Sequence, residues 1–228
     1  MYKKKCASTC RGAFLFTFAS KILEQILREQ LLEVIHFFYS KNWAPATSAN
    51  YSIRNVSDKN FYTISRSGVD KSAFTLNDFM VVDSNGDAAK DFTHLKPSAE
   101  TLLHTMLYKL YPEVNCVLHT HSVANTVMSR LRQFDNFIRL SDYEILKGIS
   151  GIATHEVSVE LPIFRNSQDI ATLSEKVEQY LKEKNCIPAF LLSSHGLYAW
   201  GKTIAEAKRH IEVIEFLLEC EFQIRITN

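Results

Sequence analysis

The stretch Cys116-Val117-Leu118-His119-Thr120-His121 is an apolar run that ends in two histidines two positions apart. Side chains on a β-strand alternate between its two faces, so both imidazoles of such a strand point the same way. Two parallel imidazoles form half of a metal site, although an isolated pair of this kind is also a common accident of a half-buried strand. The stretch therefore predicts a strand, and the rest of the chain decides whether its histidines bind a metal.

A third histidine also follows an apolar strand. His195 lies in Phe190–Gly201, a segment with the sequence FLLSSHGLYAWG that predicts a hairpin turning at this histidine. Three histidines with one open coordination position are typical of a catalytic zinc site. His195 is therefore the best candidate for a third metal ligand beside His119 and His121, while His155, in a polar loop, is a weaker candidate for a fourth ligand.

Composition narrows the class of protein. The 228 residues include 26 basic and 25 acidic side chains spread evenly, so the net charge of +1 provides no electrostatic surface for nucleic acid or an anionic membrane. A small molecule is the expected partner. Five cysteines, an odd number without a Cys-x-x-Cys pair, favour reduced thiols and a cytoplasmic protein.

The N-terminus has the order of a signal peptide, with basic residues Lys3–Lys5 before the apolar segment Ala13–Ser20. Arg11 interrupts this pattern, and the apolar run is too short to span a bilayer. We expect residues 1–20 to form a poorly ordered extension. Residues 21–228 are expected to form a single domain, because no repeat or linker divides them.

Hydrophobic periodicity predicts helices and strands that do not follow a strict βαβ rhythm. Helical spacing occurs in segments 21–41, 98–111, 122–131, 169–183 and from 203 onward. Strand-forming residues occupy segments 51–54, 61–65, 79–83, 114–121 and 157–164, together with the hairpin 189–201. We therefore expect an α/β protein of the α+β type, with helices packed on a mostly antiparallel sheet. The motifs of dinucleotide, P-loop and serine-hydrolase sites are absent.

Two loops of small residues could bring backbone amides close to an anion. They are Ala46–Asn50 and the turn Arg66–Lys71. The first is equally well explained as a plain turn.

Two carboxylates are candidate proton carriers. Glu144 lies among apolar neighbours, and an apolar pocket would raise its pKa and suit proton transfer. Glu100 falls in the first turn of the helix that Ser98 is expected to cap, where the helix dipole favours a carboxylate for structural reasons alone.

Five motifs, taken in order, resemble the class II aldolase/adducin family. They are Thr47–Asn50, Arg66–Lys71, Lys96–Glu100, Val117–His121 and Ser194–Gly201. The resemblance spans residues 31–222. It implies a three-layer fold, a homotetramer with sites near subunit interfaces, and one zinc ion per subunit at the three histidines.

The resemblance also implies a sugar-phosphate substrate. It places the phosphate at the positions matching Asn50, Ser67, Gly68, Ser98 and Ala99, with Ala49 standing where the family usually has glycine. The aldolases have their acid/base carboxylate at the position matching Glu100, and the dehydratases are expected to use the one matching Glu144. Both residues are present, so their roles stay open.

Within the family, Tyr143–Ile149 and Ser67–Lys71 are most similar to the branch that dehydrates 5-methylthioribulose 1-phosphate in methionine salvage. This similarity implies a zinc-dependent hydro-lyase, with Glu144 as the proton carrier. One alternative is a metal-dependent aldolase or epimerase acting on a fuculose or ribulose phosphate. Another is an adducin-like, non-catalytic interaction module, which would be expected to lack the three histidines.

Overall fold

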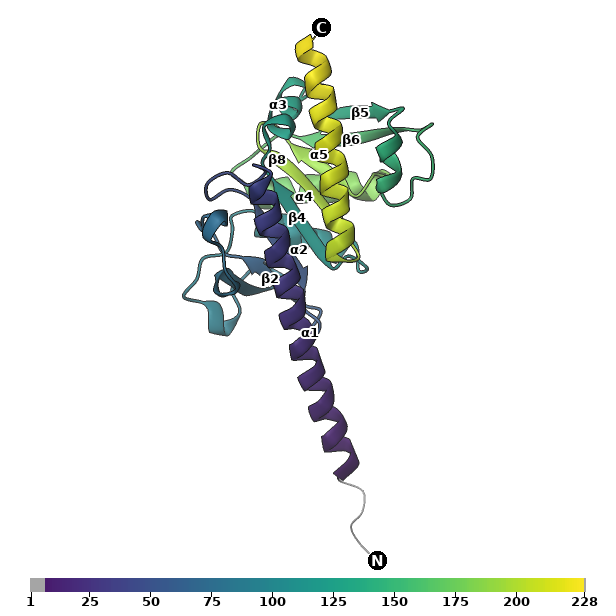
Figure 1. Cartoon of the computed structure of the whole chain (residues 1–228). Coiled ribbons are helices and arrows are strands. Elements are labelled where there is room, and N and C mark those ends of the chain that lie inside the picture. Colours follow the sequence, from purple (N-terminus) through teal and green to yellow (C-terminus); the bar gives the residue numbers. More distant parts are fainter. Residues whose placement is uncertain (1–6, 228) are drawn as a thin grey trace, which may run out of the picture.

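The computed structural model describes residues 7–227, and the side chains of residues 19–227. Its eight strands form one sheet in the order β3-β2-β1-β4-β8-β7-β6-β5 (Figure 1). The strands are β1 (Asn50–Arg54), β2 (Phe61–Ser65), β3 (Phe79–Asp83), β4 (Cys116–Thr120), β5 (Phe137–Ser141), β6 (Ser158–Phe164), β7 (Ala189–Leu192) and β8 (Gly196–Gly201). All neighbouring strands pair antiparallel except β6 and β7. The expected mostly antiparallel sheet is confirmed.

Within residues 7–227, five α-helices and four short 3₁₀ helices surround this sheet. The α-helices are α1 (Ala7–Ser40), α2 (Thr101–Leu110), α3 (Val123–Leu131), α4 (Ile170–Glu183) and α5 (Ile204–Thr227). The 3₁₀ helices are η1 (Lys71–Ala73), η2 (Leu76–Asp78), η3 (Lys90–Phe92) and η4 (Glu144–Gly148). In the part of the chain that the structure describes, no helix is both long and apolar enough to cross a membrane.

Two helices begin at different residues from those expected. The first starts at Ala7 instead of Lys21, and residues 1–6 of the expected extension lie outside the described part of the chain. The second, α2, starts at Thr101 with Glu100 as its N-cap residue, so Ser98 lies two residues before the N-cap position and does not cap the helix.

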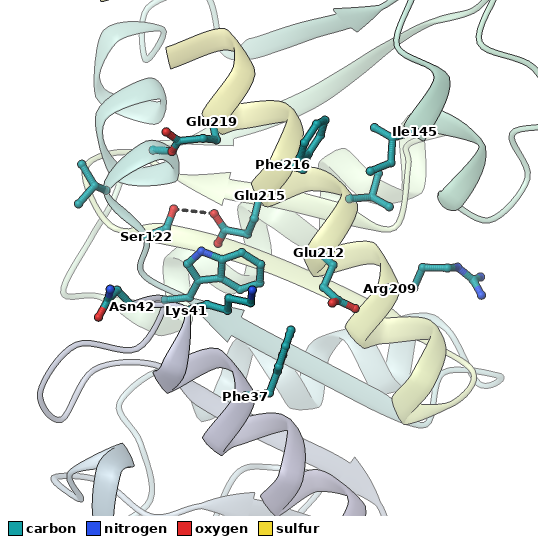
Figure 2. A pocket seen from close by; sticks show the side chains of 14 residues that line it. Phe37, Lys41, Asn42, Ser122, Ile145, Arg209, Glu212, Glu215, Phe216 and Glu219 are labelled. Carbon is teal, nitrogen blue, oxygen red and sulfur yellow. Dashed lines mark hydrogen bonds between the residues drawn. The ribbon is translucent and has the colours of Figure 1, made fainter. Parts of the chain in front are cut away.

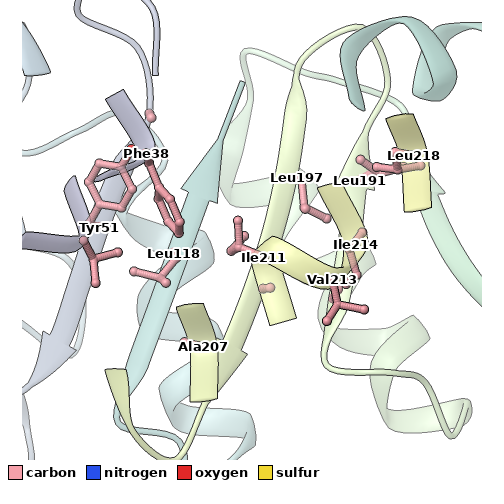
Figure 3. Close-up of a cluster of buried hydrophobic side chains, with 14 of the residues drawn as sticks. Phe38, Tyr51, Leu118, Leu191, Leu197, Ala207, Ile211, Val213, Ile214 and Leu218 are labelled. Carbon is pink, nitrogen blue, oxygen red and sulfur yellow. The ribbon is translucent and has the colours of Figure 1, made fainter. Parts of the chain in front are cut away.

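Helices cover both faces of the sheet, which gives the expected three layers. On one face, Leu118 of β4 and Leu197 of β8 belong to a buried cluster with Ile211 and Ile214 of α5 (Figure 3). On the other face, side chains of α2 and α4 pack against β4 and β8. Each fully buried aliphatic side chain stabilises the fold by about 1.5–3 kcal/mol.

The register of β4 determines what surrounds its histidines. His119 lies opposite Asn50 on β1 and opposite Tyr198 on β8. Because β1 begins at the first small-residue loop and β8 begins just after His195, both loops meet at the carboxyl end of β4.

Candidate metal centre and phosphate pocket

The structure brings three histidines together from two elements. His119 and His121 lie at the end of β4, and His195 lies in the turn between β7 and β8. One ring nitrogen of each lies within 4.8 Å of the others. The Nε2 atom of His119 is 2.7 Å from Nε2 of His121 and 3.4 Å from Nε2 of His195. No fourth ligand joins this group among the described residues, so His155 is not part of it.

Hydrogen bonds orient two of the three imidazoles for metal binding. His119 donates from Nδ1 to the carbonyl oxygen of Leu197 at 2.9 Å, and His195 donates from Nδ1 to Oδ1 of Asn166 at 3.2 Å. Both Nε2 atoms therefore carry a lone pair, and these lone pairs face each other. A cation between them satisfies both, and such outer contacts commonly orient metal-bound histidines.

The protonation of the histidines also suits a metal. Burial is the largest cause that lowers the pKa of His119 and His195, and it lowers the pKa of His121 to about 3. All three are therefore neutral at pH 7, the form that binds metal. Tetrahedral zinc with nitrogen ligands at 2.0–2.1 Å separates those nitrogens by about 3.3 Å, so the group fits zinc after a small displacement of His121.

Glycine at position 196 allows β8 to approach β4 closely. A Cβ atom at Gly196 would lie 2.2 Å from the carbonyl oxygen of Thr120 and 2.6 Å from Cε1 of His119. A side chain at this position would therefore push the hairpin away from the histidine strand.

A cavity of about 220 Å³ lies beside the histidines. Its lining includes His121, Glu100 and all the residues expected to bind phosphate, which are Asn50, Ser67, Gly68, Ser98 and Ala99. Ala49 also lines it and has φ of 68°, in the left-handed region that favours glycine. The two small-residue loops are therefore walls of one pocket.

Glu100 faces this pocket and does not cap α2 with its side chain. Its Oε2 atom accepts hydrogen bonds from Nδ2 of Asn50 at 2.6 Å and from Oγ of Ser98 at 2.8 Å. Its Oε1 atom lies 3.7 Å from Nε2 of His195. The helix-dipole explanation for Glu100 is therefore incomplete, because the carboxylate belongs to the same cluster as the histidines.

A buried network fixes the amide of Asn50. Its Oδ1 atom accepts a hydrogen bond from Nε2 of His104, whose Nδ1 atom bonds with Oγ of Ser52 at 2.7 Å. Ser52 in turn bonds with the hydroxyl of Tyr108 at 2.8 Å. Burial lowers the pKa of His104 to about 3, so the ring is neutral and turns the amide NH₂ of Asn50 toward Glu100. Sequence reasoning missed His104, although an imidazole inside a buried helix stripe was a usable signal.

Glu215 holds the junction between β4 and α3. Its side chain is buried and accepts a hydrogen bond from Ser122 at 2.5 Å (Figure 2). It also accepts hydrogen bonds from Thr120 at 2.6 Å and from Asn125 at 2.9 Å. Burial raises the pKa of this carboxyl group. Sequence reasoning missed it too, although Glu215 lies four positions after the inward-facing Ile211 on α5.

Glu144 lies outside the 220 Å³ cavity, and the prediction that an apolar pocket encloses its carboxylate is wrong. Its side chain is 68% exposed and pairs with Lys147 and His155. The hydrogen bond from Lys147 is the largest cause that lowers its pKa. The neighbouring Leu146 is buried, whereas Glu144 begins η4 and points outward, so the apolar neighbours do not enclose it. It does not line the 220 Å³ cavity.

A larger cavity of about 580 Å³ lies between the end of α1, η4 and α5 (Figure 2). Phe37, Trp43, Ile145 and Phe216 contribute its apolar lining. Among the described residues it contains no cluster of three metal-ligating side chains. The smaller cavity is therefore the better candidate for the reaction site.

Curated relatives cover nearly the whole chain. A methylthioribulose-1-phosphate dehydratase from Picosynechococcus sp. is 46% identical over 204 residues, which are 89% of this chain and 95% of the relative. An enzyme of the same name from Stenotrophomonas maltophilia is 44% identical over 199 residues, or 87% of this chain and 91% of the relative.

Solved structures share the fold at low sequence identity. An L-fuculose 1-phosphate aldolase has a TM-score of 0.71 at 18% identity, covering 89% of this chain and 87% of the other. The L-fuculose-1-phosphate aldolase from Thermus thermophilus has a TM-score of 0.67 at 21% identity, and the match covers 88% of this chain and 94% of the aldolase. The model of the class II aldolase and adducin N-terminal domain matches residues 29–222. This chain therefore belongs to the class II aldolase and adducin N-terminal domain family.

Proposed function

We propose that this chain is a lyase that dehydrates 5-methylthioribulose 1-phosphate to 2,3-diketo-5-methylthiopentyl 1-phosphate in methionine salvage. The observation that carries the proposal is the convergence of three neutral histidines with a small-residue cavity that suits a phosphate. Relatives that are 44–46% identical over most of the chain carry the name of this dehydratase. Release of one water from this substrate by the metal-loaded protein is the direct test.

We propose that His119, His121 and His195 hold one zinc ion per subunit. A bound divalent ion acts as a Lewis acid on the ketone group and lowers the cost of removing the neighbouring proton. Imidazole ligands suit several divalent metals, so metal analysis of the purified protein identifies the ion.

The residues of the cavity orient the substrate. Asn50, Ser67, Gly68, Ser98 and Ala99 line the part of the cavity proposed for the phosphate, next to His121. This arrangement directs the sugar carbons toward the histidines. The reaction removes the C3 proton, releases the C4 hydroxyl with one proton as water, and leaves an enol that tautomerises to the 2,3-diketone. Atoms balance without an oxidant or reductant.

Glu144 is the proton carrier in this proposal, and Glu100 is the second candidate. Since Glu144 is exposed and does not line its own chain's cavity, it acts in the site of a neighbouring subunit of a homotetramer. Apolar side chains of α1 that this chain leaves exposed support assembly. They are Ile22, Leu23 and Ile26, which are 42–47% exposed.

Replacing Glu144 by glutamine is expected to lower kcat by about 10²–10⁴-fold with unchanged metal content, because general acid/base catalysis contributes that much. Steady-state kinetics and metal analysis on Glu144→Gln, Glu100→Gln and the control Glu156→Gln measure this. Glu156 is exposed and lies outside the cavity. Near-normal turnover in Glu144→Gln with loss in Glu100→Gln would reverse the assignment.

Mixing two inactive variants tests whether Glu144 acts between subunits. In mixed oligomers of Glu144→Gln and His195→Ala, some interfaces combine an intact metal site with an intact Glu144, so activity returns. If Glu144 served its own chain, every chain in the mixture would be defective and no activity would return.

Product analysis also separates the alternative functions. An aldolase would release a two- or three-carbon fragment, and an epimerase would leave the mass unchanged, whereas a dehydratase keeps the carbon skeleton and loses water. Retention of all three histidines argues against an adducin-like, non-catalytic module.

We place the reaction in the cytoplasm, an assignment supported by the free thiols of Cys116, Cys186 and Cys220.

A further inference from the structure

Lys71 is a buried lysine in the wall of the phosphate cavity. It is 1% exposed, it begins η1 directly after the second small-residue loop, and it lines the same cavity as Ser67 and Ser98. Lysine is rarely this buried unless an anion accompanies it, because removing an ammonium group from water is costly.

The neighbours of Lys71 hold its ammonium group without neutralising it. The Nζ atom donates hydrogen bonds to the carbonyl oxygens of Val69 at 2.9 Å and Thr47 at 3.5 Å, and it lies 5.6 Å from the ring centre of Phe74. None of these groups carries a charge. Among the described residues, no carboxylate forms an ion pair with Lys71.

The nearby carboxylates are already engaged. Asp70 accepts the backbone N–H of Ser72 at 2.8 Å, and Asp78 accepts two hydrogen bonds from Arg66 at 2.6 and 3.0 Å. Arg66 is the other cation in the cavity wall, and its charge is therefore matched by Asp78. The charges of Asp70 and Asp78 act on Lys71 from nearby, but neither carboxylate contacts its ammonium group in an ion pair, so Lys71 is the cation of this wall that is free to contact a bound anion.

The ammonium group remains protonated and acts on the site. Burial is the largest cause that lowers the pKa of Lys71, to about 8, so most of the molecules carry the charge at pH 7. Three causes lower the pKa of His121. Burial is the largest, the charge of His195 is the second, and the charge of Lys71 is the third. The cation therefore lies within electrostatic range of the metal-binding histidines.

We propose that the Lys71 ammonium binds the phosphate of the substrate and makes the site select phosphorylated over unphosphorylated sugars. This inference rests on the proposed function, since it assigns a charged partner to the phosphate of that substrate. Apart from Arg66, which is paired with Asp78, the residues expected to bind the phosphate offer hydroxyl, amide and backbone N–H donors, which position an anion but do not balance its charge of about −2. Lys71 provides the balancing charge.

Lys71 also connects the two loops, so a test must separate its charge from its hydrogen bonds. Its backbone N–H bonds to Ala46 at 3.4 Å, and its side chain reaches Thr47. Lys71→Gln keeps amide N–H donors and removes the charge. Lys71→Arg keeps the charge. Lys90→Gln removes an exposed lysine outside the cavity and serves as the control.

Calorimetric titration of the metal-loaded protein with inorganic phosphate tests the proposal without requiring turnover. Lys71→Gln is expected to weaken phosphate binding about 10- to 100-fold, the usual range for a hydrogen bond to a charged group. Lys71→Arg is expected to retain most of the affinity for phosphate, and Lys90→Gln is expected to retain all of it. Lys71→Gln also raises KM for 5-methylthioribulose 1-phosphate more than it lowers kcat, and leaves the affinity for unphosphorylated 5-methylthioribulose unchanged.

Phosphate affinity of a folded, metal-loaded Lys71→Gln within twofold of the wild type would overturn the proposal and leave Lys71 as a loop connection. If Lys71→Gln does not fold, the ¹⁵Nζ resonance of Lys71 in the wild-type protein decides the matter. It must shift when phosphate is added, and an unchanged resonance at saturating phosphate would overturn the proposal. If the proposed function is wrong and Lys71 nevertheless binds phosphate, no dehydration product forms, but phosphate binding still depends on Lys71. The two failures are therefore distinguishable.

Discussion

The variant His195→Ala is expected to lose the bound divalent metal and to lower kcat/KM for 5-methylthioribulose 1-phosphate on the order of 10³-fold. The Nε2 lone pair of His195 faces that of His119 at 3.4 Å, so its removal leaves two ligands in place of three. The Lewis acid contributes several kcal/mol of stabilisation to the transition state, and each 1.36 kcal/mol changes the rate tenfold.

Metal analysis together with steady-state kinetics measures this effect. His155→Ala is the matched control, because His155 pairs with Glu144 and lies outside the three-histidine group. The control is expected to keep its full metal content. An unchanged metal content in folded His195→Ala would show that the metal lies elsewhere.

Gly196→Ala is expected to disrupt the metal site through the backbone. The new Cβ atom would lie 2.2 Å from the carbonyl oxygen of Thr120, which cannot move without disturbing the pairing of β4 with β8. Crowding of this kind usually costs about 1–3 kcal/mol of unfolding free energy. Displacement of His119 is expected to weaken metal binding by about 10- to 100-fold, as changes around metal ligands do.

A second glycine separates the loss of stability from the loss of metal. A Cβ atom at Gly148 would lie 2.6 Å from Cγ2 of Val213, away from the histidines. Gly148→Ala should therefore lower the melting temperature and retain the metal. If Gly196→Ala kept both its melting temperature and its metal affinity, the close approach of the hairpin would not be required.

Local signals predicted much of the fold. The strand-forming segments 61–65 and 79–83 correspond to β2 and β3 without any shift, since hydrophobic alternation and turn residues determine these boundaries. The histidine pair of β4 was predictable for the same reason, because side chains two apart on a strand share a face. His195 was a candidate third ligand because it follows an apolar strand in a glycine turn, but its convergence with the other two histidines depends on the pairing of β4 with β8, which local patterns do not describe.

The polar partners of the site were harder to predict. His104 and Glu215 lie on helices whose buried stripes are mostly apolar, and their partners Asn50 and Thr120 are far away in sequence. Such contacts depend on how the layers pack, which local periodicity does not describe. Glu144 illustrates the opposite error, since apolar neighbours in sequence do not form a pocket when a 3₁₀ helix turns the carboxylate outward.

Mass spectrometry of the products formed by the zinc-loaded protein from 5-methylthioribulose 1-phosphate decides whether this chain removes water from that substrate. We expect one product that keeps the carbon skeleton and is lighter than the substrate by one water. Cleavage of the substrate into two fragments, or its recovery at unchanged mass, would rule out the dehydration.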